Sequence, residues 1–108
     1  MKTLITRLIA ATNNYEVERA LSLFAPDAVI DDESVGSKFE GRAGVRSYLE
    51  KFFVGYHTVS KLISIEQLGD RRAKAHLDFT GDFGHEAGVL EITVNADGLI
   101  AEVAADLD

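Results

Sequence analysis

The residues best suited to chemistry in this chain are carboxylates and imidazoles. The candidates for proton transfer are Asp32, His57, His76 and Asp78. An imidazole beside a carboxylate is held in one tautomer and is ready to exchange a proton near neutral pH. Asp32 lies in the acidic run Asp31–Glu33, and a carboxylate that faces an apolar pocket loses solvation and becomes a useful acid or base. Runs of like charge are also typical of solvated turns, so both interpretations of Asp32 stay open.

Each histidine also has a purely structural interpretation. His57 would then be a half-buried residue at a strand end, bonded to the backbone, and His76 a histidine satisfied within a cavity. The third histidine, His85, lies in a glycine-flanked loop, and the chain contains no His-x-His or His-x₃-His pair. Because metal sites need convergent ligands, we expect neither a metal nor a cofactor.

The composition excludes several classes of protein. The chain has 108 residues, which fits a single domain over 1–108, and its 46% hydrophobic content is enough to form a core. The formal net charge of −7 repels phosphate backbones and anionic lipid, so we expect no nucleic-acid or membrane partner. Cysteine is absent, which excludes disulfides and thiol nucleophiles, and no nucleophile-elbow, phosphate-loop or dinucleotide motif occurs.

Hydrophobic periodicity predicts a largely helical first half. Leu4, Ile5 and Leu8 recur at helical spacing, which indicates an amphipathic helix rather than a membrane span or signal segment. The default expectation is therefore a soluble, cytoplasmic protein. The predicted elements of this half are helices over 2–13, 15–24 and 42–54, a strand over 27–32 and a loop over 33–41.

The second half changes to a period of two, which is typical of strands. The segment 72–83 alternates throughout, with Leu77 and Phe79 on one face and His76 and Asp78 on the other. The predicted elements are strands over 57–68, 72–83, 89–94 and 99–105, turns over 69–71 and 95–98, and a loop over 84–88. Helices followed by an antiparallel meander predict an α+β fold.

Two segments carry a resemblance to a known superfamily. Residues 23–32 read LFAPDAVIDD, and residues 39–46 read FEGRAGVR. A helix, this LFAPDAV run with an acidic strand end, and a G-R-x-x-V start of the next helix together resemble the signature of the SnoaL-like, or NTF2-like, superfamily. The order and approximate length of every predicted element agree, so the resemblance covers nearly the whole chain. It implies a fold more than a function, because this superfold hosts many activities.

The resemblance implies an NTF2-like (cystatin-like) cone, in which a strongly curved, mostly antiparallel sheet wraps around three N-terminal helices. It also implies one open pocket and a homodimer formed through the outer sheet face. By comparison with ketosteroid isomerases, the His76 and Asp78 face of the strand 72–83 should line the cone. The hydrophobic pattern instead buries Leu77 and Phe79. Both expectations hold if a second subunit covers Leu77 and Phe79.

Ketosteroid isomerase-like members of the superfamily carry a proton-shuttling carboxylate at the position of Asp32. Their oxyanion hole needs a tyrosine and a protonated acid. Those positions fall on Leu8 and Leu90, which donate no hydrogen bond. Steroid isomerisation by that mechanism is therefore not expected.

Scytalone dehydratase-like members offer a second comparison, because they carry a catalytic histidine at the position of His57. The spacing from His57 to His76 fits that alignment without a gap. The partner histidine of that set falls on Asp82, and its acid falls on Asn13. Only part of the dehydratase set is kept.

These observations favour a small-molecule protein that performs acid–base catalysis on a hydrophobic, oxygenated substrate, as a cyclase, dehydratase or isomerase. Its expected catalytic residues are Asp32, His57, His76 and Asp78. Its expected pocket-lining residues are Leu8, Tyr56, Thr80 and Leu90. Tyr48, Phe52 and Phe53 lie at helical spacing and are interpreted as core. The alternatives are a ligand-binding or dimeric accessory module without turnover and a protein-interaction domain.

Overall fold

The fold is described from a computed structural model that covers residues 1–108. Its helices are α1 (Lys2–Asn13), α2 (Val17–Leu21) and α3 (Gly41–Leu49), and a π-helical turn, η1 (Glu50–Val54), continues α3. Its strands are β1 (Phe24–Asp32), β2 (Ser37–Glu40), β3 (Val59–Gly69), β4 (Arg72–Gly81), β5 (Gly84–Val94) and β6 (Ile100–Leu107). No helix has the length and apolar character needed to cross a membrane.

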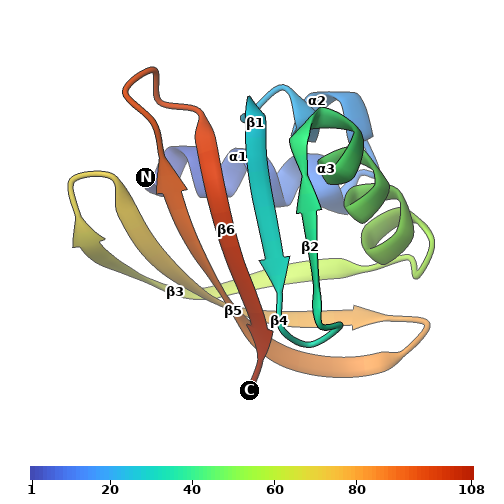
Figure 1. Cartoon of the computed structure of the whole chain (residues 1–108). Helices are drawn as coiled ribbons and strands as arrows, with labels where there is room; N and C mark the ends of the chain where they lie inside the picture. The colour runs from blue at the N-terminus through green and yellow to red at the C-terminus, as the bar shows by residue number, and fades with distance from the viewer.

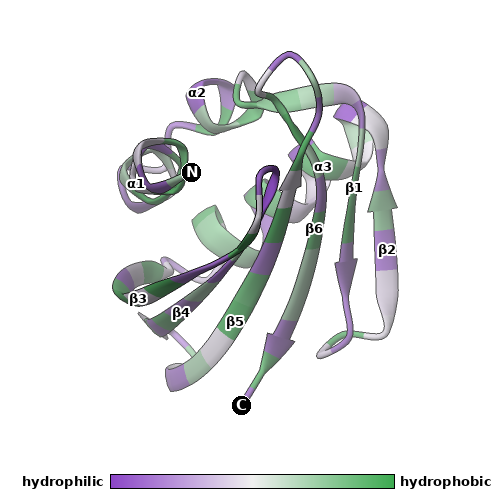
Figure 2. Ribbon diagram, turned by 90° about the vertical axis from the view of Figure 1, so that its left-hand side faces the viewer, coloured by the Kyte–Doolittle hydropathy of each residue, from purple (hydrophilic) through white to green (hydrophobic).

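The strands form one curved sheet in the order β2-β1-β6-β5-β4-β3. Neighbouring strands are antiparallel except β1 and β6, which are parallel. The helices lie on the concave side, where α1 crosses above β3 and β4 and α3 stands beside β1 and β2 (Figure 1). Figure 2 shows the sheet curving around the helices. The α+β cone that the sequence predicts is confirmed.

The core lies between α1, α3 and the concave face of the sheet. On β4 the buried residues are the small or apolar ones, Ala73, Ala75 and Leu77, each at most 2% exposed. Ile92 and Val103 continue this layer across β5 and β6. Burying a side chain such as Leu or Ile contributes about 1.5–3 kcal/mol to the free energy of folding. The apolar face of β4 is therefore the face that is turned toward the helices.

The predicted helix over 2–13 is confirmed at both ends by α1, whereas the next predicted helix is too long. Tyr15 has a left-handed backbone (φ 58°) that no helix contains, and α2 begins only at Val17. Phe24 already belongs to β1, ahead of Pro26. Proline is tolerated here because the β1–β6 pairing shifts register between Phe24 and Val29.

The two predicted loops are also partly wrong. The loop over 33–41 contains β2, which pairs with the end of β1. Ser37 lies opposite Asp32, and Glu40 lies opposite Val29. The loop over 84–88 belongs to β5, because a tight turn at residues 82–83 joins β4 directly to β5. Gly84 makes this turn feasible, since its φ of 101° suits glycine alone. Both strands extend the wall of the cone toward its open end.

Candidate functional site

A cavity of about 480 Å³ opens at the wide end of the cone. We call it the cone cavity. It lies where β1, β4 and β6 end and β5 begins, with α3 and η1 along one side. Its lining residues are Asp32, Ser34, Val35, Tyr48, Phe52, Phe53, Tyr56, Thr58, Phe79, Asp82, Phe83, Glu86, Leu90, Ala105, Asp106 and Leu107. Cavities of this size with mostly apolar walls and a few polar groups are typical ligand sites.

Asp32 lies on the wall of the cone cavity, and its residue is only 5% exposed. The phenol of Tyr48 donates a hydrogen bond of 2.5 Å to its Oδ2. The backbone N–H and the hydroxyl of Ser34 donate bonds of 2.9 and 2.6 Å to its Oδ1. Three donors therefore stabilise a carboxylate that burial has taken out of water.

The local sequence explains why only one acid of the run points inward. Successive side chains of a strand alternate between its faces, so Asp32 follows the buried Ile30 to the inside. Asp31 points to the outer face, and Glu33 begins the exposed turn to β2. Ser34 then folds back on Asp32 in the Asx-type turn that aspartate favours. The acidic run is thus neither wholly solvated nor wholly buried.

Tyr48 is a core residue, as the sequence interpretation has it, but it also lines the cone cavity and binds Asp32, which that interpretation missed. α3 brings its hydroxyl within hydrogen-bond distance of Asp32. Its ring packs on the rings of Phe39 and Phe52, with centroid distances of 5.0 and 4.9 Å. Burial raises the pKa of Tyr48 far above its usual range, and the hydrogen bond to Asp32 and the charge of that carboxylate raise it further. A buried tyrosine needs a partner for its hydroxyl, and this requirement was the available signal.

Tyr48 is expected to ionise only when the protein unfolds. Because its folded-state pKa is raised, the folded chain keeps a proton that the unfolded chain releases above a pH of about 10. The contribution of Tyr48 to the free energy of unfolding is therefore complete below that pH and is lost as the pH rises further. Alkaline titration should show its tyrosinate absorbance rising together with the loss of circular dichroism, and Tyr48→Phe should lack this step. Full ionisation of all three tyrosines in a folded protein would contradict the expectation.

His57 lies at the rim of the cone cavity and does not line it. Its Nδ1 is 2.9 Å from Oδ2 of Asp82, and both side chains are exposed. The structure thus pairs His57 with Asp82, the position at which the dehydratase-like set has its partner histidine. His57 also has a left-handed backbone (φ 54°), and its ring meets the edge of Tyr15. Its hydrogen bond goes to Asp82, whereas the partners of Asp32 are Tyr48 and Ser34.

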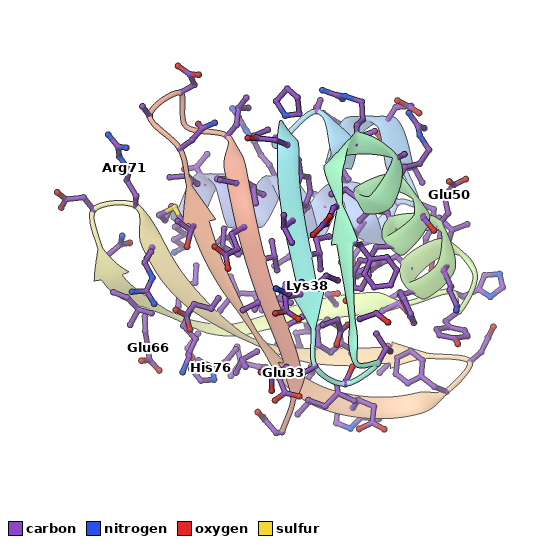
Figure 3. The ribbon with its side chains drawn as sticks, in the orientation of Figure 1. Glu33, Lys38, Glu50, Glu66, Arg71 and His76 are labelled. Atoms are coloured by element: carbon purple, nitrogen blue, oxygen red, sulfur yellow. The ribbon has the colours of Figure 1, made fainter.

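The expectation that His76 and Asp78 line the cone is wrong. Both lie on the outer face of β4, where His76 Nε2 is 2.7 Å from Oε1 of Glu66. Asp78 Oδ1 is 3.6 Å from Nε2 of His85. Figure 3 shows His76 and Glu66 together below the sheet, on the side away from the helices. The reason is hydrophobic: the alternate residues of β4 are needed in the core, which leaves the polar face outside.

The expected pocket-lining residues divide between three places. Tyr56 and Leu90 line the cone cavity. Leu8 lines a small void of about 30 Å³ deeper in the core, beyond Tyr48 and Leu90. Thr80 is exposed on the outer face. The prediction that Thr80 lines the pocket is therefore wrong, because it shares the outer face with His76.

Asn13, the position at which the dehydratase-like set has its acid, connects two elements of the fold. The side chain of Asn13 exchanges two hydrogen bonds with the backbone of Ser60, at 3.0 and 2.7 Å, and so fixes α1 to β3. This position is a structural clamp between two elements.

The chain contains no group of three or more His, Cys, Asp or Glu side chains arranged to hold a metal ion.

Comparison with known proteins identifies the family. A model of the SnoaL-like domain matches residues 5–103, and the chain belongs to this family. No curated protein sequence matches it significantly.

Solved structures with this fold share little sequence with the chain. The epoxide hydrolase/cyclase-like enzyme SalBIII of salinomycin pyran-ring formation is 19% identical, with a TM-score of 0.87 over 99% of this chain and 89% of its own. An NTF2-like protein from Cytophaga hutchinsonii is 13% identical, with a TM-score of 0.83 over 99% and 88%. RV0760c from Mycobacterium tuberculosis, in complex with estradiol-17beta-hemisuccinate, is 20% identical, with a TM-score of 0.84 over 95% and 89%.

Proposed function

We propose that the cone cavity binds a hydrophobic, oxygenated small molecule and that Asp32 exchanges a proton with it. The observation that carries the proposal is a buried carboxylate on the wall of a mostly apolar cavity. Such a carboxylate can act as a general acid or base toward a ligand bound in the cavity. Cyclisation, dehydration and isomerisation each include a step in which a positioned carboxylate can take a proton from the substrate or return one to it. The complex of the similar protein RV0760c with estradiol-17beta-hemisuccinate supports a ligand with a large apolar body.

The hydrogen bonds around Asp32 leave it one position for a substrate. A carboxylate has about four acceptor sites, two on each oxygen. Ser34 occupies both sites of Oδ1, and Tyr48 occupies one site of Oδ2. The remaining site of Oδ2 is the place where a substrate proton would arrive. Tyr48 would act as a positioning residue that fixes this oxygen and supports its charge.

The alternative is a ligand-binding module of the same fold without turnover. Two observations favour it. The oxyanion donors of the isomerase-like mechanism are replaced by Leu8 and Leu90, and the imidazole of His57 pairs with Asp82 at the rim. A base that lacks an oxyanion donor takes a proton without stabilising the anion it creates. In this alternative Asp32 would only anchor a donor group of the ligand.

Identification of the natural ligand separates the two functions. Native mass spectrometry of the purified protein, followed by solvent extraction, should reveal an apolar molecule bound at one per cavity. Incubating that molecule with fresh protein should then yield a product of changed mass or chromatographic mobility. Recovery of the molecule unchanged after long incubation would support the binding module, and a cavity that takes up no apolar compound would refute both functions.

We further propose a homodimer through the outer sheet face. The face is polar around His76 and Asp78, but Val59 and Ile63 on β3 are 44% and 55% exposed beside it. Covering these side chains would remove apolar area from water. Sedimentation equilibrium should give twice the mass of the 11.8 kDa chain. A monomeric mass that Ile63→Lys leaves unchanged would overturn the proposal.

A further inference from the structure

The charged residues that line the cone cavity all have the same sign. Its lining includes Asp32, Asp82, Glu86 and Asp106, and it includes no lysine, arginine or histidine. An anionic ligand would therefore enter against several carboxylates and find no cation to pair with. A field of one sign in a cleft with apolar walls raises the local concentration of the opposite charge.

Three of these carboxylates, Asp32, Glu86 and Asp106, belong to no ion pair of the chain. Asp32 is held by Tyr48 and Ser34 deep in the cavity, and Asp82 is paired with His57. Glu86 and Asp106 belong to no ion pair, and both are exposed at the mouth. Asp32 has its charge stabilised by hydrogen bonds from Tyr48 and Ser34, whereas the two unpaired carboxylates at the entrance, Glu86 and Asp106, are left for a ligand.

The hydroxyl groups of the wall give an independent indication. Tyr48 and Ser34 donate their hydroxyl protons to Asp32, and Thr58 donates to the carbonyl of Phe52 at 2.6 Å. Each of these hydroxyls has spent its only donor within the protein. Apart from Tyr56 at the rim, the side chains of the wall offer a ligand acceptors only. A bound molecule is therefore better recognised through its own N–H or O–H groups.

The rim provides contacts for the apolar part of such a molecule. Val35, Tyr56, Phe83 and Leu107 all line the cavity, and each is 41–42% exposed. They come from the β1–β2 turn, the turn after η1, the β4–β5 turn and the end of β6. A ligand seated among them would place its apolar body against these side chains and its outer end beside Glu86 and Asp106.

We infer that the ligand of the cone cavity is a cationic amphiphile, an apolar molecule with a protonated amine at the end near Glu86 and Asp106. The inference rests on the proposed function, because it assumes that the cone cavity binds an apolar molecule. It adds the charge class of that molecule and two residues that select it. The ammonium group supplies both the positive charge and the hydrogen-bond donors that the wall lacks.

The test uses three probes with one apolar chain and different ends: decylamine, decanol and decanoate. Isothermal titration calorimetry at neutral pH and low ionic strength should give the lowest Kd for decylamine, with decanoate at least about tenfold weaker. Raising the salt concentration should narrow this difference, because the carboxylates at the mouth are exposed to screening.

Two double variants separate local charge from net charge. Glu86→Gln with Asp106→Asn should reduce the Kd ratio of decanoate to decylamine to within about threefold, since the unpaired charges at the mouth are gone. Glu40→Gln with Glu102→Gln changes the net charge equally at exposed positions away from the cavity, and it should keep the wild-type ratio. Equal loss of the ratio in both variants would overturn the inference.

The outcomes for the two proposals are distinct. Decanoate binding as tightly as decylamine, with decanol also binding, would refute the charge class and leave the apolar ligand site standing. Failure of all three probes to bind would refute the ligand site itself. Both proposals would be supported if one decylamine binds per chain and binds more weakly to the variant that combines Glu86→Gln with Asp106→Asn.

Discussion

Replacing Asp32 by asparagine is expected to slow conversion of the natural ligand by about 10²–10⁴-fold, the usual contribution of a positioned acid or base. The amide has nearly the shape of the carboxylate, and its oxygen still accepts from Ser34, so the loop from β1 to β2 keeps its conformation. It takes up no proton, however. The Kd of the ligand should change only a few-fold, and the loss should fall on kcat.

The neighbouring acid provides a matched control. Glu33→Gln removes the same charge one residue away, in the exposed turn, and it should leave kcat within about twofold because Glu33 does not line the cavity. Thermal unfolding of both variants would show whether the fold is kept. If Asp32→Asn converted the ligand at the wild-type rate, Asp32 would not be the proton-transfer group. The binding module would then be the better description of the protein.

Replacing Tyr48 by phenylalanine is expected to lower the free energy of unfolding by about 1.5–3 kcal/mol. The substitution removes one hydroxyl from a ring that is otherwise packed against Phe39 and Phe52. It leaves Oδ2 of the buried Asp32 without its donor, and hydrogen bonds to charged groups fall in this range. Urea denaturation at neutral pH, with the slope checked for two-state behaviour, measures the change.

Tyr56→Phe is the control for this stability measurement. It removes the same atom from a tyrosine that is 41% exposed at the rim and should change the free energy of unfolding by less than about 0.5 kcal/mol. Combining Tyr48→Phe with Asp32→Asn completes a double-mutant cycle, in which the second substitution should cost less once the first is present. Additive costs would show that the two side chains do not support each other.

The fold was accessible from the sequence because its signals are local. The helical spacing of Leu4, Ile5 and Leu8 needs only a few turns of chain to be recognised, and α1 follows it. Alternation over 72–83 likewise predicted a strand, and β4 follows it to Gly81. Short elements are a different matter: β2 has four residues, and it is a strand only because β1 lies beside it.

The site was only partly accessible. Asp32 was selected from the sequence, and it lies on the cavity wall. Its partners were not found, because Ser34 folds back through a turn and Tyr48 arrives from α3, sixteen residues further along the chain. Nothing in the periodicity of α3 distinguishes a tyrosine that packs from one that also donates a hydrogen bond.

The sequence alone determined that this chain forms an α+β fold, which its resemblance to the superfamily refined to a cone, and that its chemistry must come from carboxylates and imidazoles. Only the tertiary structure decided which of them meet. The faces of β4 show the physical reason: alternation separates His76 and Asp78 from Leu77, but burial of the apolar face in the core determines which set points into the interior. That choice removed two expected residues from the cone cavity and left Asp32, Tyr48 and the acidic mouth as the candidate site.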